Sequence, residues 1–462
     1  VALAALAPTL GLDSAAAASV VQKYRRYPGR PVLVAGDASF AQVSAIEERR
    51  AELPGGILVE AGPKRRYPAG PVSAHVVGYV AEISDAELES REFAGVAPGA
   101  IVGKMGVERE YDRWLRGEPG VRYVEVNALG RFVGEFRGRP PTPPVPGRDL
   151  TLTLDLELQR AVADAFPDTM RGAVVALDPR TGDVLAMYSH PTFDPNAFVG
   201  GIDPALWSAW NEDPARPLFN RAIAGTYPPG STFKLAVAAI AMAGGDVAAG
   251  TTMPIPCRGA LLYYSRVFRC WRPEGHGTLD LLGAIKHSCD VYFYQLGLRV
   301  GLERLVRGVL GFGFAERTGI DLPSEAAGIF PLGPEWYDRR YGRGGWTNAV
   351  VLNLAIGQGE NAQTMLKLAQ FFSALATEGG RMPRPRITPL RPVEWVGPPL
   401  PLTEAQRRQL VEGMVRVVND TGGTARGARL ERWVLAGKTG TAQNPHGDAH
   451  ALFLGFAPAA AP

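Results

Sequence analysis

The sequence predicts an α+β, multi-domain chain, and three observations support that fold class. The chain is 462 residues long, which is typical of two domains. A proline-rich stretch at 139–147 is predicted to be a stiff, extended linker. Patterns typical of strands and of helices follow it. We therefore expect one domain over residues 1–145 and a second over residues 146–462.

The elements are predicted in chain order from turn residues and hydrophobic periodicity. Residues 40–53 favour an early helix, and the alternating residues 150–154 favour a strand. The amphipathic pattern at 155–166 predicts a helix, and residues 172–189 predict a β-hairpin. The run 235–243 is apolar on every face, which indicates a fully buried helix.

Composition argues against some classes of function. The net charge is +3 and 46% of the residues are hydrophobic, which is ordinary for a globular protein. The basic runs are short and predict solvated faces, so no nucleic acid is expected as a partner. The apolar start, residues 1–12, is too short to cross a membrane and is interrupted by Pro8.

The first of three short motifs with candidate catalytic residues begins at Ser231 and ends at Lys234. This Ser-Thr-Phe-Lys motif lies between a rigid proline turn at 227–230 and the predicted buried helix. Ser231 would stand at a helix N-terminus, where free N–H groups favour an oxyanion. Lys234 would lie one turn on, on the same face, where burial favours a neutral lysine able to act as a base. Ser231 could instead be a simple N-cap.

Two further motifs follow in the second half of the chain. They are Ser288-Cys289-Asp290 and Lys438-Thr439-Gly440-Thr441. Ser288 would relay a proton. The third motif follows a strand-like stretch at 433–437, its ammonium and hydroxyls suit a carboxylate, and Gly440 would let a substrate backbone approach. Lysine is rare in this arginine-rich chain, yet both outer motifs contain it, and arginine could not release a proton there.

In this order the motifs resemble those of penicillin-binding proteins and serine β-lactamases. The likeness continues at 101–108, at 313–319 and at 356–359, and it covers nearly the whole chain. The chain most resembles class B penicillin-binding proteins of the elongation type, the penicillin-binding protein 2 group, which fits an aspartate at position 290. The resemblance implies a transpeptidase domain with an antiparallel sheet flanked by helices. An elongated, mixed α/β pedestal domain would precede it.

The resemblance further implies a two-step D,D-transpeptidase reaction on peptidoglycan. Ser231 would attack the penultimate D-alanine of a stem peptide, with the N–H groups of Ser231 and Thr441 as the oxyanion hole. The amino group of a neighbouring peptide would then resolve the acyl-enzyme, and β-lactams would trap the same serine. One alternative is a D,D-carboxypeptidase or β-lactamase, in which water replaces the amine. Another is a non-enzymatic β-lactam sensor or activator of a glycosyltransferase.

The family also implies partners and a location. Its members carry one N-terminal helix in the cell inner membrane, with the catalytic domain in the periplasm. The pedestal contacts a SEDS-family glycosyltransferase of the RodA type. We expect the membrane helix, the first pedestal strand, and the last strand and helix of the transpeptidase domain to lie outside this chain. No cofactor is expected for catalysis.

Asp290 leaves two possibilities open. A charged carboxylate could pair with Lys234 and favour the protonated lysine. It could also be held by another part of the chain.

The three cysteines, together with His276, predict a metal site. Cys257, Cys270, His276 and Cys289 follow the spacing Cys-x12-Cys-x5-His-x12-Cys, and these ligand types bind structural zinc. Zinc there would brace the loop that carries Ser288. The alternatives are a Cys257–Cys270 disulfide, which an extracytoplasmic compartment permits, and free thiols.

Overall fold

The computed structural model describes all residues except 1, 27–31, 55–56, 128–131 and 445–446. The chain divides into two compact units, each described separately below. Unit 1 consists of Val1–Leu150 and Thr192–Leu218, and unit 2 of Thr151–Pro191 and Phe219–Pro462. The first division lies near the predicted linker, whereas the return of Thr192–Leu218 to unit 1 is not predicted by the sequence.

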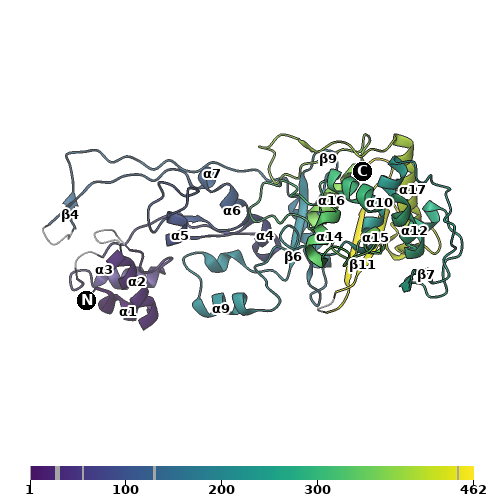
Figure 1. Ribbon diagram of the computed structural model, residues 1–462. Coiled ribbons are helices and arrows are strands. Elements are labelled where there is room, and N and C mark those ends of the chain that lie inside the picture. The colour runs from purple at the N-terminus through teal and green to yellow at the C-terminus, as the bar shows by residue number, and fades with distance from the viewer. Residues whose placement is uncertain (1, 27–31, 55–56, 128–131, 445–446) are drawn as a thin grey trace. The chain divides into compact units, whose positions relative to one another are not determined.

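Unit 1 is built from short helices and strands (Figure 1). The helical elements are α1 (Ala2–Leu10), α2 (Ser14–Arg26), α3 (Phe40–Glu48), η1 (Gly70–Ser73), α4 (Ala74–Val77), α5 (Asp85–Leu88), α6 (Gly106–Glu110), α7 (Asp112–Arg116), η2 (Pro195–Phe198) and α9 (Pro204–Glu212). The strands form two antiparallel pairs, β1 (Val80–Glu82) with β2 (Ile101–Gly103) and β3 (Val124–Val126) with β4 (Phe132–Glu135). The predicted helix 40–53 is present but ends earlier, at Glu48.

The proline-rich stretch 139–147 is extended, as predicted, but it is not a free linker. Thr142 pairs with Val121 and Val145 pairs with Glu118 through isolated antiparallel bridges. The stretch is therefore fixed within unit 1. The sequence prediction missed this because proline prevents regular pairing but still permits single bridges.

Unit 2 contains the three sequence motifs. Its helical elements are α8 (Leu156–Ala165), η3 (Gly230–Phe233), α10 (Lys234–Ala243), α11 (Leu281–Lys286), α12 (Asp290–Val300), α13 (Leu302–Gly311), α14 (Pro334–Tyr341), α15 (Val350–Ala355), α16 (Met365–Ala376), α17 (Glu404–Asn419) and η4 (Arg426–Ala428). Its strands are β5 (Gly172–Leu177), β6 (Val184–His190), β7 (Ala260–Tyr263), β8 (Arg266–Arg269), β9 (Met382–Pro383), β10 (Trp395–Val396), β11 (Ala436–Ala442) and β12 (His450–Phe456).

The strands of unit 2 pair antiparallel, as predicted. The predicted hairpin forms as β5 and β6, and the predicted helix forms as α8, capped by Asp155. The strand predicted at 150–154 is wrong. Thr153 instead makes single hydrogen bonds, from its N–H to the Ile387 carbonyl and from its hydroxyl to the Val184 carbonyl.

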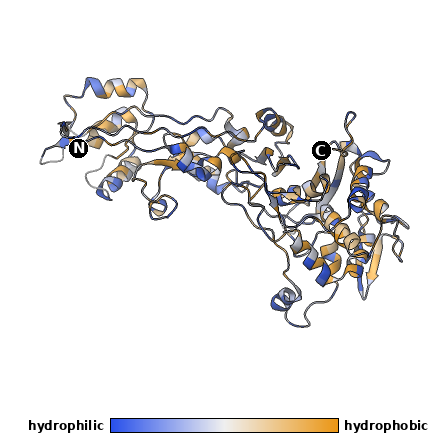
Figure 2. Ribbon diagram, turned by 90° about the horizontal axis from the view of Figure 1, so that it is seen from above, coloured by the Kyte–Doolittle hydropathy of each residue, from blue (hydrophilic) through white to orange (hydrophobic). Residues whose placement is uncertain are grey.

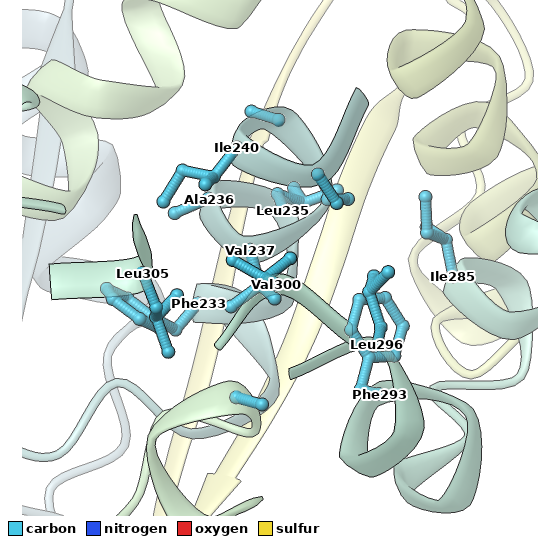
Figure 3. Close-up of a cluster of buried hydrophobic side chains, with 14 of the residues drawn as sticks. Phe233, Leu235, Ala236, Val237, Ile240, Ile285, Phe293, Leu296, Val300 and Leu305 are labelled. Atoms are coloured by element: carbon cyan, nitrogen blue, oxygen red, sulfur yellow. The ribbon is translucent and has the colours of Figure 1, made fainter. Parts of the chain in front are cut away.

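Helix α10 is the centre of the unit 2 core. Its residues Leu235 to Met242 are all buried, which confirms the prediction from the all-apolar run except at the last residue, Ala243, which is exposed. Figure 3 shows Leu235, Val237 and Ile240 packed among side chains of neighbouring helices, including Phe293 and Leu296 of α12. Some other helices carry both hydrophilic and hydrophobic segments (Figure 2), as expected for elements with one solvated face. Among the described residues, no helix has both the length and the apolar character needed to cross a bilayer.

Candidate active site and metal centre

Ser231 stands at the start of the buried helix, as predicted. It lies in the 3-10 turn η3, and α10 continues directly from Lys234. Ser231 is partly exposed, whereas Lys234 has no exposed surface. The sequence thus places a reachable hydroxyl one turn away from a fully buried amine.

The Lys234 amine lies among three oxygen atoms from the second motif. Its Nζ donates to the Ser288 carbonyl at 2.8 Å and to Asp290 Oδ1 at 2.7 Å, and lies 3.3 Å from Ser288 Oγ. The other carboxylate oxygen, Asp290 Oδ2, accepts the backbone N–H of Trp271 at 3.0 Å. Both possibilities left open by the sequence are therefore realised, because Asp290 pairs with Lys234 and is also held by a second segment.

Lys438 also contacts the Ser288 side chain. Its Nζ donates to Ser288 Oγ at 2.9 Å and to the Thr439 carbonyl at 2.9 Å. Burial holds the pKa of Lys438 well below its ordinary value, and the nearby Lys234 cation lowers it further, against the opposing effect of Asp290. A neutral Lys438 can accept a proton from the Ser288 hydroxyl. Ser288 thus joins two buried lysines that are far apart in the sequence.

Ser288 adopts a backbone conformation that non-glycine residues rarely take. Its φ is +52°, in the left-handed region, at the junction between α11 and α12. The N–H groups of Ser288 and Cys289 donate to carbonyls of the preceding turn, at Ile285 (3.2 Å) and Ala284 (3.0 Å). Surrounding contacts therefore hold the strained residue, as is common at functional sites.

The third motif lies on β11, which pairs with β12. This strand begins at Ala436, so the strand predicted over 433–437 starts later and contains the motif itself. Gly440 faces the Ser231 segment, because a Cβ there would lie 2.8 Å from Thr232 Cγ2 and 2.9 Å from the Pro229 carbonyl. We expected this glycine to admit a substrate backbone. In the structure, the turn that contains Pro229 and Thr232 packs closely against this glycine instead.

Three contributors to the site were not identified as site residues from the sequence. The Trp271 backbone orients Asp290, the Thr424 hydroxyl lies 2.8 Å from that of Thr439, and Gln358 donates to the Thr441 carbonyl at 3.4 Å. Gln358 belongs to the 356–359 stretch that carried the family resemblance, and that resemblance was the only feature of the sequence that pointed to it. No feature of the sequence pointed to Trp271 or Thr424, since their roles depend on long-range packing.

The four predicted metal ligands form a single cluster. The ligand atoms of Cys257, Cys270, His276 and Cys289 all lie within 4.8 Å of one another. His276 Nδ1 is 3.6 Å from Cys257 Sγ and 3.5 Å from Cys270 Sγ. A tetrahedral zinc, about 2.3 Å from sulfur and about 2.05 Å from nitrogen, would separate these atoms by about 3.5 Å. The donor set and its spacing therefore fit zinc.

The thiols of the cluster are coupled and are not joined by a disulfide. All three cysteines are free, so the alternative Cys257–Cys270 disulfide is absent. The hydrogen bond from Cys289 lowers the pKa of Cys270 to about 5 although burial opposes this, and the pKa of Cys289, which holds the shared proton, is raised. The cluster thus favours the thiolate form of Cys270, and the thiolate is the form of cysteine that binds metals.

Comparison with known proteins identifies both parts of the chain. The model of the penicillin-binding protein transpeptidase domain matches residues 172–462, and that of the penicillin-binding protein dimerisation domain matches residues 2–152. Peptidoglycan D,D-transpeptidase MrdA of Acinetobacter baumannii is 37% identical over 435 residues, which cover 88% of this chain and 63% of that protein. The chain therefore spans less than two thirds of the length of this relative.

Solved structures show the same architecture. The match to a complex between PBP2 and MreC from Helicobacter pylori has a TM-score of 0.85 at 30% identity and covers 100% of this chain and 85% of that chain. A match to a structure described as the coordination of polymerization and crosslinking by a peptidoglycan synthase complex has a TM-score of 0.73 at 32% identity, covering 91% and 74% of the two chains. This chain belongs to the penicillin-binding protein family, with a transpeptidase domain that follows a dimerisation, or pedestal, domain.

Proposed function

We propose that the protein is a serine-type peptidoglycan D,D-transpeptidase of the elongation type that crosslinks stem peptides and is acylated by β-lactams. The observation that carries this proposal is the Lys234–Ser288–Lys438 arrangement beside Ser231, with both lysines buried. The 37% identity to a protein named peptidoglycan D,D-transpeptidase supports it.

In the proposed reaction, Lys234 first passes its ion-pair proton through Ser288 to the neutral Lys438. The Ser231 oxygen then attacks the penultimate D-alanine carbonyl and passes its proton to Lys234. The backbone N–H groups of Ser231 and Thr441 stabilise the oxyanion. Collapse of the intermediate breaks the peptide bond, and the departing D-alanine amine receives a proton through Ser288. The amine of a second stem peptide then attacks the ester, which forms the crosslink and returns the proton to Ser231.

Substrate binding is assigned to the exposed side of β11. Lys438 is buried and its neutral form is favoured, so the hydroxyls of Thr439 and Thr441 provide most of the contact with the terminal carboxylate. Gly440 provides the close packing that sets these hydroxyls beside Ser231. Asp290 orients Lys234 and keeps it paired in the resting site.

Zinc has a structural role in this proposal. Cys257, Cys270, His276 and Cys289 would hold it, and the ion would fix the segment whose Trp271 N–H orients Asp290. It takes no part in the chemical steps.

The pedestal is proposed to contact a SEDS-family polymerase of the RodA type in the cell inner membrane, with unit 2 in the periplasm. Two similar solved structures support a role within a larger complex: one is a complex of PBP2 with MreC, and the other is described as a peptidoglycan synthase complex. Its test is glycan polymerisation by the partner with surface variants of unit 1, such as Ile101→Asp at a half-exposed site. Unchanged polymerisation by all such variants would argue against the contact.

The mass of the protein after incubation with a penicillin tests the main proposal. We expect one adduct on the wild type and none on Ser231→Ala. A long-lived adduct and crosslinked product with an amine acceptor support a transpeptidase, whereas rapid loss of the adduct to water supports a hydrolase. An adduct without any turnover would favour a sensor, and no adduct would refute the proposal.

A further inference from the structure

The hairpin of β7 and β8 is bracketed by two residues of the metal cluster. Cys257 precedes β7 and Cys270 follows β8, so the cluster clamps the base of the hairpin. Trp271 comes next and donates its N–H to Asp290. The hairpin is thus connected to Lys234 of the candidate active site through Cys270, Trp271 and Asp290, with two hydrogen bonds along this path. Figure 1 shows β7 at the margin of unit 2, and both strands contact α12.

One face of the hairpin is apolar and exposed. Opposed residues of an antiparallel pair share a face, so Leu262 and Val267 lie together on one side, and Leu261 and Phe268 on the other. Leu261 is buried and Phe268 packs against Tyr294. By contrast, Leu262 and Val267 are 67% and 60% exposed, a degree of exposure that a structural role for these side chains does not explain.

The same hairpin carries uncompensated positive charge. Residues 257–276, which run from the first clamping cysteine to His276, include four arginines but only one acidic residue, Glu274. Glu274 lies 3.9 Å from Arg272. The exposed side chains of Arg258, Arg266 and Arg269 have no carboxylate partner among the residues that the structure describes.

We propose that this hairpin binds the acidic stem peptide of the acceptor strand during crosslinking. Stem peptides combine free carboxylates with small apolar side chains. The exposed apolar face of the hairpin carries Arg269 beside Leu262 and Val267. Arg266 is exposed near the hairpin turn and Arg258 just before β7. Arginine forms strong, oriented hydrogen bonds with carboxylates. The proposal rests on the proposed transpeptidase function and adds the site of the second substrate.

The position of the hairpin favours the acceptor over the donor. The donor carboxylate is assigned to Thr439 and Thr441 on β11. The segment that follows the hairpin instead contacts Asp290, the partner of Lys234, where an incoming amine must release its proton. Clamping the hairpin base would keep the bound peptide at a fixed distance from the acyl-enzyme, which lowers the entropic cost of the second step.

The test measures binding of a soluble disaccharide-tetrapeptide to the full chain after Ser231 has been acylated with penicillin, so that the donor site is blocked. We expect the variant Arg258→Gln/Arg266→Gln/Arg269→Gln to bind about tenfold more weakly. Amidation of the peptide carboxylates, or added salt, should weaken wild-type binding in the same way.

A matched control removes the same charge elsewhere in unit 2. Arg160, Arg317 and Arg339 are exposed and have no carboxylate partner among the described residues. The variant with all three changed to glutamine should bind as the wild type does. In crosslinking assays, the hairpin variant should raise the acceptor KM and leave the rate of penicillin acylation unchanged.

Failure of this proposal can be separated from failure of the proposed function. Formation of the penicillin adduct tests the proposed transpeptidase function. If no adduct forms, the binding of the disaccharide-tetrapeptide is measured on Ser231→Ala instead. Equal binding by the hairpin variant and the wild type would overturn the inference. So would hairpin-dependent binding to vesicles of anionic lipid without binding to the muropeptide, since the surface would then face a membrane.

Discussion

Lys234 and Asp290 form a buried ion pair, with 2.7 Å between Nζ and Oδ1, and Lys234 also donates to the Ser288 carbonyl. Lys234 has no exposed surface, and the second Asp290 oxygen is held by Trp271. A buried charge needs such compensation. The pair therefore links the resting position of the proposed base to the segment between Cys270 and His276, two of the proposed metal ligands.

Replacing Lys234 tests its role as base. Lys234→Arg keeps the charge opposite Asp290 but cannot surrender a proton, so acylation by penicillin should slow by about 10²- to 10⁴-fold. The rate is measured by intact mass over time. Lys104→Arg, which changes a lysine paired with Glu87 in unit 1, should acylate at the wild-type rate. Near-normal acylation of Lys234→Arg would assign the base to another group.

Adding one methyl group at Gly440 tests the packing of β11 against the Ser231 turn. Gly440→Ala would put a Cβ 2.8 Å from Thr232 Cγ2 and 2.9 Å from the Pro229 carbonyl. We expect a loss of about 1–3 kcal/mol in the free energy of unfolding, with slower acylation because the turn must move. Gly427→Ala meets no atom within 4 Å and is the control. If the two variants behave alike, the close contact has no functional consequence.

Metal analysis tests the cluster. The purified protein should contain about one zinc per chain, and Cys270→Ser should lose most of it. Chelation should lower the melting temperature and slow acylation, because the Trp271 N–H would no longer be held against Asp290. Added zinc should restore both properties. A protein without zinc, whose intact mass shows a Cys257–Cys270 disulfide, would contradict the metal site.

Local patterns account for what could be predicted from the sequence. The start of α10 and the β5–β6 hairpin depend on neighbouring residues, so periodicity and turn residues were sufficient. The metal cluster was predicted because four ligand types of suitable chemistry lie within one segment.

Long-range packing accounts for what could not be predicted. Nothing near Trp271 in the sequence indicates that its backbone meets Asp290, and nothing near Gly440 indicates that Thr232 packs against it. The full burial of Lys438, which changes its proposed role from substrate contact to proton relay, also depends on elements distant in the chain. The return of Thr192–Leu218 to unit 1 is of the same kind.

Lys367 provides a prediction about pH and stability away from the active site. It is 2% exposed, and its Nζ donates to Gln370 Oε1 at 2.9 Å and to the Arg317 carbonyl at 3.4 Å. Burial lowers its pKa from 10.5 to about 8, although the carboxylates of Glu325 and Glu316 oppose this. Between these two values, the unfolded chain binds a proton that the folded chain does not. Stability due to this group therefore rises with pH across that window.

The measurement compares urea unfolding of the wild type and Lys367→Met at about pH 7 and about pH 9.5. The wild type should gain about 2 kcal/mol relative to the variant as the pH is raised, because the proton lost from Lys367 on folding costs less at the higher pH. Leu366→Met, a buried and uncharged change on the same helix, should differ from the wild type by the same amount at both pH values. A pH-independent difference for Lys367→Met would mean that the folded protein holds this lysine charged throughout the window.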